Sequence, residues 1–335
     1  MASQAPPFSP APPLPDFLAR QLPYDRAVFT LQHGPDAGRR LHFIDHGDRT
    51  ARPVLMLHGN PTWSFLWRKV IALLPGYRCV APDLLGLGLS DRLPHAADHT
   101  LERHGEAVAA LVAALDLRGI VLLCQDWGGP IGMQVALRHP DRIAGVVIAN
   151  TIVTLPLRWR ATWFHRLARI PVLNQLAFRV LNLPGRMLWM VQGDKRSIRG
   201  EVARAYRWPL RSWADRQTPL TLARMVPVNA DHPSVEPLRR GEEWLRAFAG
   251  PMAIVWGTRD PVLGSALRRH ERIFPNAPVT RTLAGHFLQE EVPEALAAAV
   301  EDMVRRIVPS EGPTEEPAPS ANGARPATSE TPATG

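Results

Sequence analysis

The sequence predicts an α/β fold, with a mostly parallel sheet of eight strands flanked by helices and an inserted helical cap. Three observations support this prediction. Short apolar runs alternate with longer stretches of helical periodicity, as expected of strands joined by crossover helices. The later runs are nearly continuous in Val, Ile and Leu, which is typical of strands covered on both faces. One connection, of about a hundred residues, is far longer than the others.

Eight apolar runs are the candidate strands. The first two lie close together and suit an antiparallel lead-in, whereas the later ones suit parallel strands buried between two layers of helices. In chain order the candidates are Ala27–Gln32, Arg40–His46, Val54–Leu57, Arg78–Ala81, Ile120–Cys124, Ala144–Ile148, Met252–Trp256 and Val279–Leu283. Helical periodicity between them is clearest in Leu101–Leu115 and Pro293–Ile307.

The long connection contains the predicted cap, residues 155–230. Leu, Trp and Phe recur there at helical spacing, and fourteen Arg and Lys residues stand against three Asp and Glu. The α/β core is therefore expected in two pieces, 25–154 and 231–308. Proline-rich stretches flank it: residues 1–24 are expected to form an extension. Residues 309–335 are expected to form a disordered tail, because they hold too few apolar side chains to bury.

The composition sets limits on the class of protein. With 335 residues, 45% of them hydrophobic and 21% charged, the chain can bury a sizeable core. No stretch approaches the roughly 20 apolar residues of a membrane span, and the N-terminus has no apolar signal-peptide region. The two cysteines, Cys79 and Cys124, lie in or beside apolar runs, as in proteins of reducing compartments. We therefore expect a cytoplasmic protein without disulfides.

The net charge of +8 raises the question of a nucleic-acid partner. Only Lys69 and Lys195 of the 39 basic residues are lysine, and the arginines are spread along the chain without a clustered run. Nucleic acid is therefore not an expected partner. Neither lysine follows a glycine, which excludes a Walker-type phosphate loop.

The first candidate catalytic residue is Asp126. An apolar strand ends there between the small residues Cys124 and Gly128, and a helical pattern follows, which is the layout of a nucleophile elbow. A carboxylate attacking an acyl carbon would form an anhydride, whereas displacement at an sp³ carbon forms an ester that water can cleave. Asp126 thus favours opening of a carbon–halogen bond, an epoxide or a strained ring. The alternative is a helix N-cap aspartate.

Two donors are predicted around this nucleophile. Asn60 follows His58 and Gly59 after a strand, and Trp127 follows Asp126. In such an architecture these two positions supply the backbone N–H groups of an oxyanion hole. Their side chains add an amide NH₂ and an indole N–H, which would stabilise a departing halide in a dry pocket. The alternative is an Asn-Pro turn beside a structural tryptophan.

His286 and Asp260 complete the predicted set. His286 lies between the last candidate strand and the last helix, and its near-neutral pKa suits a general base. Asp260 lies four residues past the strand Met252–Trp256, where a carboxylate can stabilise the imidazolium. After the preceding strand the corresponding residue is Asn150, which cannot serve as the acid. A structural histidine and an Asp-Pro turn are the alternatives.

Together and in this order, the motifs resemble the α/β-hydrolase superfamily and, within it, the haloalkane dehalogenases. The resemblance covers most of residues 25–307 and rests on HGNPTWSFLWR, APDLLGLGLSDR, QDWGGPIG, WGTRDP and AGHFLQEEVPE. It implies that Asp126 is the nucleophile, His286 the base and Asp260 the acid. It also implies a halide-stabilising pair, Asn60 with Trp127, and no metal or cofactor. The expected reaction is hydrolytic dehalogenation of haloalkanes through a covalent alkyl-aspartyl intermediate.

Related activities remain as alternatives. Asn60, the position of Asp260 and Asn150 in place of Glu resemble the third dehalogenase subfamily, which also holds β-lactone decarboxylases of long-chain olefin synthesis that use equivalent residues. Epoxide hydrolases need a cap tyrosine to protonate the opening ring, and only Tyr206 lies in the predicted cap. Fluoroacetate dehalogenases use arginines near the nucleophile, where Gln125 stands here. A non-catalytic binding module is disfavoured because every predicted catalytic residue is present.

The cap is expected to choose the substrate. Its aromatic and leucine side chains could pack as cap core or line the pocket of a small apolar substrate, which would react with water. Those at helical spacing are Trp159, Trp163, Phe164, Phe178, Leu181 and Trp189. The mixture of Trp and Arg would also suit a membrane surface or a long lipid-like substrate, so peripheral membrane association through the cap is a further hypothesis. The sequence predicts no oligomeric state.

Overall fold

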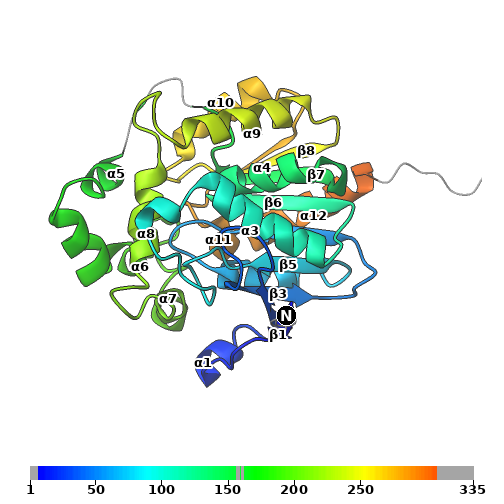
Figure 1. Ribbon diagram of the computed structural model, residues 1–335. Helices are drawn as coiled ribbons and strands as arrows, with labels where there is room; N and C mark the ends of the chain where they lie inside the picture. Colours follow the sequence, from blue (N-terminus) through cyan, green and yellow to red (C-terminus); the bar gives the residue numbers. More distant parts are fainter. Residues whose placement is uncertain (1–6, 156–158, 160–161, 308–335) are drawn as a thin grey trace, which may run out of the picture.

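The computed structural model describes residues 7–155, 159 and 162–307, and within them the chain forms a nine-stranded sheet in the order β1-β2-β3-β5-β4-β6-β7-β8-β9 (Figure 1). The strands are β1 (Phe8–Pro10), β2 (Arg26–Thr30), β3 (Arg40–His46), β4 (Pro53–Leu57), β5 (Arg78–Pro82), β6 (Ile120–Asp126), β7 (Ile143–Thr151), β8 (Met252–Gly257) and β9 (Val279–Thr282). Strands β4 to β9 pair in parallel with one another, β2 and β3 form the antiparallel lead-in that the sequence predicts, and β1 adds a further antiparallel strand to it.

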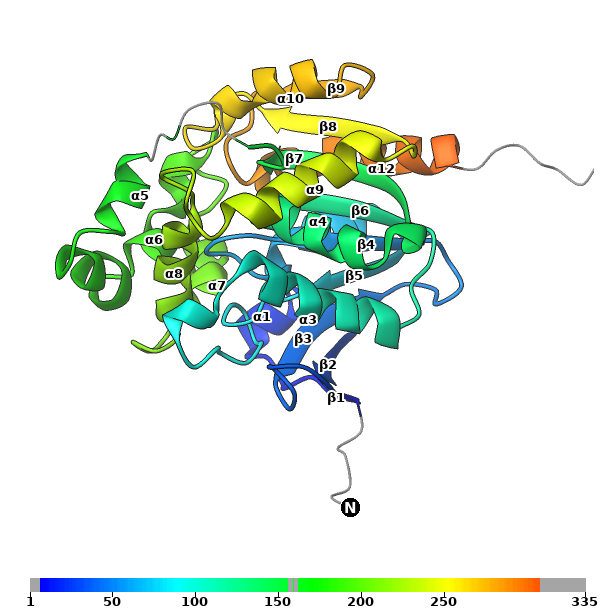
Figure 2. The same ribbon diagram turned by 45° about the horizontal axis from the view of Figure 1, so that its top comes forward.

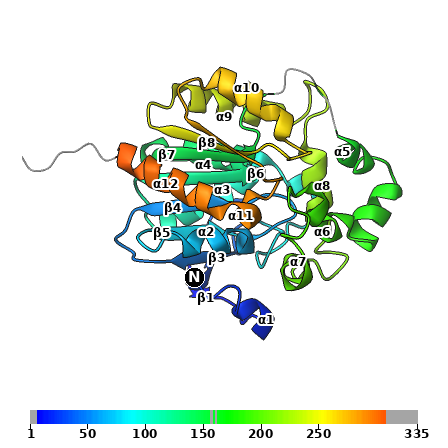
Figure 3. The ribbon, with the colours of Figure 1, turned by 180° about the vertical axis from the view of Figure 1, so that it is seen from behind.

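Helices cover both faces of the sheet. One face carries α3 (Leu101–Ala114), α4 (Gly128–Arg138), α9 (Val235–Ala247) and α10 (Leu267–Ile273), as Figure 2 shows. The other carries α2 (Arg68–Ala72), α11 (Leu288–Glu291) and α12 (Pro293–Ile307), which Figure 3 shows from behind. The buried apolar side chains divide into two large clusters, one on each face, so the central strands are covered on both sides.

The predicted elements are present with shifted ends. β3 and α12 have the predicted bounds, and α3 ends one residue earlier. β6 runs two residues further than predicted, to Asp126. β7 is also longer at its end and reaches Thr151, so both strands extend to the edge where the candidate catalytic residues lie.

The prediction of eight strands is wrong by one. Phe8–Pro10 pairs antiparallel with β2 at the edge of the sheet, and α1 (Asp16–Ala19) follows. A three-residue strand has no periodicity to detect, and proline is tolerated there because an edge strand needs only one side of its ladder. The stretch predicted as a proline-rich extension therefore contains a strand and a short helix in its described part. The predicted tail, 309–335, lies outside the described residues.

Between β7 and α9 the chain forms α5 (Trp163–Leu167), a π-helix (Gln175–Val180), α6 (Leu183–Arg186), α7 (Gly200–Arg207) and α8 (Gln217–Met225). These helices gather at one end of the sheet (Figures 1 and 2). We refer to the described residues of 155–230 as the cap. A small apolar cluster of its own, which includes Phe178 and Leu220, packs the π-helix against α8.

Short 3₁₀ helices connect several of the elements. They are Ser64–Trp67, Ala96–Asp98, Pro140–Arg142, Leu188–Val191 and Gly264–Ala266. Within the described residues, no helix combines the length and the apolar character that crossing a bilayer demands.

Candidate active site

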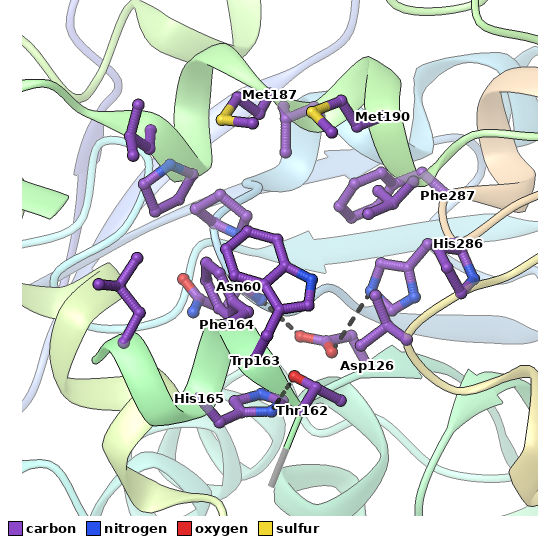
Figure 4. Close-up of a pocket in the computed structure, with 18 of the residues that line it drawn as sticks. Asn60, Asp126, Thr162, Trp163, Phe164, His165, Met187, Met190, His286 and Phe287 are labelled. Carbon is purple, nitrogen blue, oxygen red and sulfur yellow. Dashed lines mark hydrogen bonds and ion pairs between the residues drawn. The ribbon is translucent and has the colours of Figure 1, made fainter. Parts of the chain in front are cut away.

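A cavity of about 300 Å³ lies between the carboxyl ends of the central strands and the cap. Most of the side chains around it are apolar, and many of them belong to the cap (Figure 4). The predicted nucleophile, base and acid are all near it: Asp126 and His286 line the cavity, and Asp260 lies directly behind His286. Such a cavity, apolar with a few convergent polar groups, suits a small apolar ligand.

Asp126 lies at the sharp turn between β6 and α4. Its backbone has φ +50°, a left-handed conformation that side-chain-bearing residues seldom adopt outside functional turns. The turn fits tightly: a Cβ on Gly128 would lie 1.9 Å from the carbonyl oxygen of Leu57, and one on Gly59 would lie 2.1 Å from Oδ1 of Asp126. The hydroxyl of Thr151 donates a hydrogen bond to the carbonyl of Asp126. The strand end and its small neighbours thus direct one carboxylate into the cavity.

The two oxygens of the Asp126 carboxylate have different partners. Oδ1 accepts a hydrogen bond of 2.7 Å from the backbone N–H of Asn60, and Oδ2 lies 3.5 Å from Nε2 of His286 (Figure 4). Burial by itself would raise the pKa of Asp126. The hydrogen bond and charge of His286, with the backbone N–H groups of Asn60 and Trp127, outweigh burial and hold that pKa below its usual range. The carboxylate is therefore ionised at neutral pH.

His286 is held on its other side by Asp260. Nδ1 of His286 and Oδ2 of Asp260 are 2.8 Å apart, and Oδ1 of Asp260 accepts the backbone N–H groups of Val262 and Leu263 at 2.7 and 3.0 Å. Burial by itself would lower the pKa of His286. The charge of Asp260 and the hydrogen bonds to both aspartates overcome burial and raise that pKa to about 10. The imidazole lies between two carboxylates, with one ring nitrogen toward each.

Asn150 contacts this pair from the neighbouring strand. Its side-chain NH₂ donates to Oδ2 of Asp260 at 2.9 Å and to the carbonyl of Gly285 at 3.0 Å, and its Oδ1 accepts the N–H of Gly257 at 2.8 Å. The sequence identified Asn150 only as a residue that cannot act as the acid. In the structure it joins the two loops that carry Asp260 and His286, a role that no local pattern reveals.

The predicted donors Asn60 and Trp127 both line the cavity. The side-chain amide of Asn60 donates one hydrogen bond, 3.0 Å, to the carbonyl of Pro219 in α8. Because an amide NH₂ carries two hydrogens, one remains for a ligand. Trp127 is buried, with 8% of the residue exposed, and it lines the cavity beside Asp126.

The cap also holds the loop that carries His286. The backbone N–H of His286 donates to the carbonyl of Val191 at 2.8 Å. The side chain of Gln192 is hydrogen-bonded twice to Phe287: Oε1 accepts its N–H at 2.9 Å, and Nε2 donates to its carbonyl at 3.1 Å. Gln192 was not among the sequence candidates, because its partner lies 95 residues further along the chain.

Tyr206, the tyrosine that an epoxide hydrolase would need, is buried away from the cavity. Its hydroxyl donates to Oε1 of Glu290 at 2.5 Å, and the same carboxylate is paired with Arg68. Tyr206 is not among the residues that line the cavity. This placement agrees with the sequence argument against epoxide opening.

Of the six cap side chains singled out in the sequence, Trp163, Phe164 and Phe178 line the cavity, and the other three do not. Thr162 and His165 also line it and were not anticipated, since neither belongs to the apolar pattern.

Two further expectations concern cysteines and metals. Cys79 and Cys124 are both buried free thiols. In the part of the chain that the structure describes, no three His, Cys, Asp or Glu side chains gather as they would around a metal ion.

Comparison with known proteins places the chain among hydrolases. Residues 52–293 match the alpha/beta hydrolase fold family. A haloalkane dehalogenase of Mycobacterium marinum is 35% identical over 266 residues, which cover 78% of this chain and 87% of that protein. A haloalkane dehalogenase of Psychrobacter cryohalolentis is 31% identical and covers 84% of this chain and 94% of that protein.

Solved structures give the same result. The tetrameric haloalkane dehalogenase DpaA of Paraglaciecola agarilytica is similar with a TM-score of 0.73 at 28% identity, over 84% of this chain and 93% of that one. Haloalkane dehalogenase DbeA of Bradyrhizobium elkani has a TM-score of 0.74 at 25% identity, over 84% of this chain and 99% of that one.

Proposed function

Because the chain belongs to the haloalkane dehalogenase family within the α/β-hydrolase fold, we propose that it hydrolyses carbon–halogen bonds of haloalkanes through an ester on Asp126. One observation carries the proposal: an ionised carboxylate at a left-handed turn on the floor of an apolar cavity, with a buried histidine 3.5 Å away. A carboxylate nucleophile fits displacement at an sp³ carbon better than acyl transfer. The proposed products are an alcohol, a halide ion and a proton.

In the first step Oδ2 of Asp126 attacks the carbon that bears the halogen. Oδ1 is held by the backbone N–H of Asn60 at 2.7 Å, whereas Oδ2 has only the longer contact of 3.5 Å with His286 and is the less restrained oxygen for the attack. The new C–O bond forms as the C–X bond breaks, and the electron pair leaves with the halide. The free amide hydrogen of Asn60 and the indole N–H of Trp127 stabilise that anion, more strongly in a dry cavity than in water.

In the second step water cleaves the ester. Alkylation removes the negative charge of Asp126, one of the interactions that raise the pKa of His286, so the imidazole then loses its proton more readily and can act as a base. It takes a proton from the attacking water while Asp260 stabilises the imidazolium. Water adds to the ester carbon, and Oδ1, now the carbonyl oxygen, carries the negative charge of the intermediate against the backbone N–H groups of Asn60 and Trp127. The bond between this carbon and Oδ2 then breaks, the departing oxygen takes the proton from the imidazolium and leaves as the alcohol, and the new acid of Asp126 releases a proton to solvent.

Halide release from bromo- and iodoalkanes tests this proposal. Wild-type protein is expected to release halide and Asp126→Ala is not. His286→Phe should form the alkyl-enzyme but fail to hydrolyse it, so mass spectrometry of that variant should show the added alkyl group on the peptide containing Asp126. Absence of an adduct in folded His286→Phe, together with halide release by wild type, would contradict the covalent scheme.

The alternative reaction is decarboxylation of a β-lactone by the same residues, with the ring carboxylate as the leaving group. The apolar cavity and the exposed apolar side chains of the cap would suit a long-chain substrate. Folded wild-type protein that releases no halide from any haloalkane, but converts a long-chain β-lactone to CO₂ and an alkene, would replace the first proposal by this one.

We also propose that the cap contacts anionic membrane surfaces. Of the eleven large apolar side chains exposed among the described residues, nine lie in the cap, with Val172 77% exposed. They are Trp163, Ile170, Val172, Leu173, Leu176, Val180, Leu181, Met190 and Trp213. With fourteen Arg and Lys residues against three Asp and Glu, residues 155–230 have a net charge of +11, which exceeds the +8 of the whole chain. Apolar side chains among arginines are the combination that binds an anionic bilayer surface.

Co-sedimentation with phosphatidylglycerol vesicles tests the membrane proposal, with phosphatidylcholine vesicles as the neutral comparison. Binding should require anionic lipid and weaken in Val172→Asp, but persist in the matched control Leu73→Asp, which alters an exposed leucine outside the cap. If neither vesicle binds and light scattering instead shows that Val172→Asp dissociates an oligomer, the surface is a subunit interface and the membrane proposal is wrong.

A further inference from the structure

Thr162 and His165 are polar members of the cavity wall that the proposed reaction does not use. Asn60, Asp126, Trp127 and His286, which also line the cavity with hydrogen-bonding groups, all have roles in that reaction. Thr162 and His165 come from one short stretch of the cap, in and just before α5, and the other cap residues that line the cavity are apolar or aromatic (Figure 4).

The two side chains form a hydrogen-bonded pair. Oγ1 of Thr162 and Nδ1 of His165 are 2.8 Å apart, as the dashed line in Figure 4 shows. The backbone carbonyl of His165 accepts a hydrogen bond of 2.8 Å from Arg169, whose guanidinium also bonds to the carbonyls of Arg224 and Val226 beside α8. Within the described residues, Nε2 of His165 makes no hydrogen bond to protein. The pair is thus anchored on one side and has unused hydrogen-bonding capacity on the other.

His165 is neutral at physiological pH. Burial is the main cause that lowers its pKa to about 4; Arg169 and His286 add to the effect and Asp126 opposes it. A neutral imidazole carries one N–H. If Thr162 donates to Nδ1, the free donor is the N–H at Nε2; if Nδ1 donates to Thr162, the free donor is the threonine hydroxyl. Either tautomer leaves the pair with one donor and one acceptor for a ligand.

An alkyl chain lying against this pair would remove water from it without replacing the lost hydrogen bonds. A substrate with an oxygen atom at that point would replace them, and a site with unpaired polar groups discriminates strongly against the analogue that lacks the matching group. Because the pair carries no charge, a neutral oxygen function fits it better than a carboxylate.

We propose that Thr162 and His165 form a subsite for a neutral oxygen function, a hydroxyl or a carbonyl, that the substrate carries away from the carbon attacked by Asp126. The inference rests on the proposed function, since it assigns the distal part of the same substrate. It narrows the substrate class from simple haloalkanes to alkyl chains with an oxygen substituent at a defined distance from the leaving group.

A series of ω-bromoalkanols of increasing chain length tests the subsite. Each bromoalkanol is compared with the 1-bromoalkane of equal chain length. In wild type the ratio of kcat/KM for alcohol over alkane should peak at one chain length, by roughly ten-fold, the value of one good hydrogen bond. The higher kcat/KM of the preferred bromoalkanol should come mainly from a lower KM. His165→Phe, which keeps a ring of similar size, and Thr162→Val, which keeps the shape of threonine, should both flatten the peak.

Leu167→Phe is the matched control, because it enlarges a side chain of the same cavity wall in the same helix without removing a hydrogen-bonding group. It should shift rates on both substrate series together and keep the peak. Thermal unfolding of each variant checks that the cap is intact. If the ratio of kcat/KM shows no peak in wild type, or if its peak remains in both Thr162→Val and His165→Phe, the subsite proposal is wrong.

Binding without reaction separates this proposal from the proposed function. Long-chain alcohols and diols have no halide to release, and their affinity can be followed by the fluorescence of Trp127 and Trp163, which line the cavity. If no bromide is released from any substrate, dehalogenation fails. Tighter binding of diols than of alcohols, lost in His165→Phe, would still support the subsite, and equal binding would overturn it.

Discussion

The catalytic candidates at the carboxyl edge of the sheet are each held by several partners, whereas the cap presents mainly apolar side chains to the cavity. The carboxylate of Asp260 alone accepts hydrogen bonds from Asn150, His286 and two backbone N–H groups. The cap wall has the Thr162–His165 pair, and its outer surface carries most of the exposed large apolar side chains. Bond breaking requires groups fixed in position, whereas the choice of substrate requires a wall of suitable shape.

The two regions nevertheless meet at one point. Gln192 and the carbonyl of Val191, both from the cap, hydrogen-bond the backbone on either side of the His286 side chain. Glu291 in α11 in turn accepts N–H groups of Gly193 and Gly285. The position of the base therefore depends on the cap as well as on the sheet. Four predictions test how far the division between the regions holds.

The largest effect is expected from the acid. Asp260→Asn should lower turnover by roughly 10³-fold, because the imidazolium loses its counter-charge. Asn150 lies 2.9 Å from Asp260, so Asn150→Asp in the same chain would restore a carboxylate beside His286. We expect the double variant to recover about ten-fold over Asp260→Asn, measured as halide release. Equal inactivity of the single and double variants would show that the carboxylate must come from the loop after β8.

A smaller effect is expected at Gln192. Gln192→Leu removes both hydrogen bonds to Phe287 and should slow ester hydrolysis about ten-fold, the value of a buried hydrogen bond near the base, while alkylation of Asp126 continues. The alkyl-enzyme should then accumulate and be visible by rapid-quench mass spectrometry. The control is Gln289→Leu, since the side chain of Gln289 is buried without hydrogen bonds among the described residues. If the alkyl-enzyme accumulates to the same extent in Gln192→Leu and Gln289→Leu, ester hydrolysis does not depend on the hydrogen bonds of Gln192.

Substitution of a cap residue that lines the cavity should change the preferred substrate chain length more than it changes the maximal rate. Met187 lines the cavity from the end of α6, and Met187→Ala would enlarge it. We expect the optimum of kcat/KM to move toward longer bromoalkanes by up to about ten-fold, because each methylene in an apolar pocket contributes modestly. A uniform loss over all chain lengths would mean that the cap also positions the catalytic groups from this side.

The last prediction concerns the pH dependence of stability and not turnover. The pKa of His286 is about 10 in the folded protein, above the value of about 6.5 for an unfolded histidine. Between these values the folded state binds more protons, so this contribution to stability is complete below about pH 6.5 and is lost as pH rises through about 10. The melting temperature of wild type should therefore fall more between pH 7 and 10 than that of His286→Phe. Parallel curves would contradict the raised pKa.

Much of the α/β core could be predicted from the sequence. Continuous Val, Ile and Leu runs such as Ile120–Cys124 and the helical periodicity of Pro293–Ile307 are local patterns, and both elements are present. Asp126, Asn60, Asp260 and His286 each follow a strand or precede a helix, and parallel strands bring their carboxyl ends to one edge. Their proximity follows from topology, although their catalytic roles stay predictions.

Other features depend on contacts between distant parts of the chain. The strand Phe8–Pro10 forms because β2 offers a free edge, and Gln192 acts on a backbone 95 residues away. The placement of Thr162 and His165 on the cavity wall follows from how α5 packs over the sheet. Sequence patterns report the periodicity of one element and the residues at its ends, and these determined the sheet and its catalytic candidates. The tertiary structure decided which cap side chains face the cavity, because that depends on packing between elements and not on the order of residues within one.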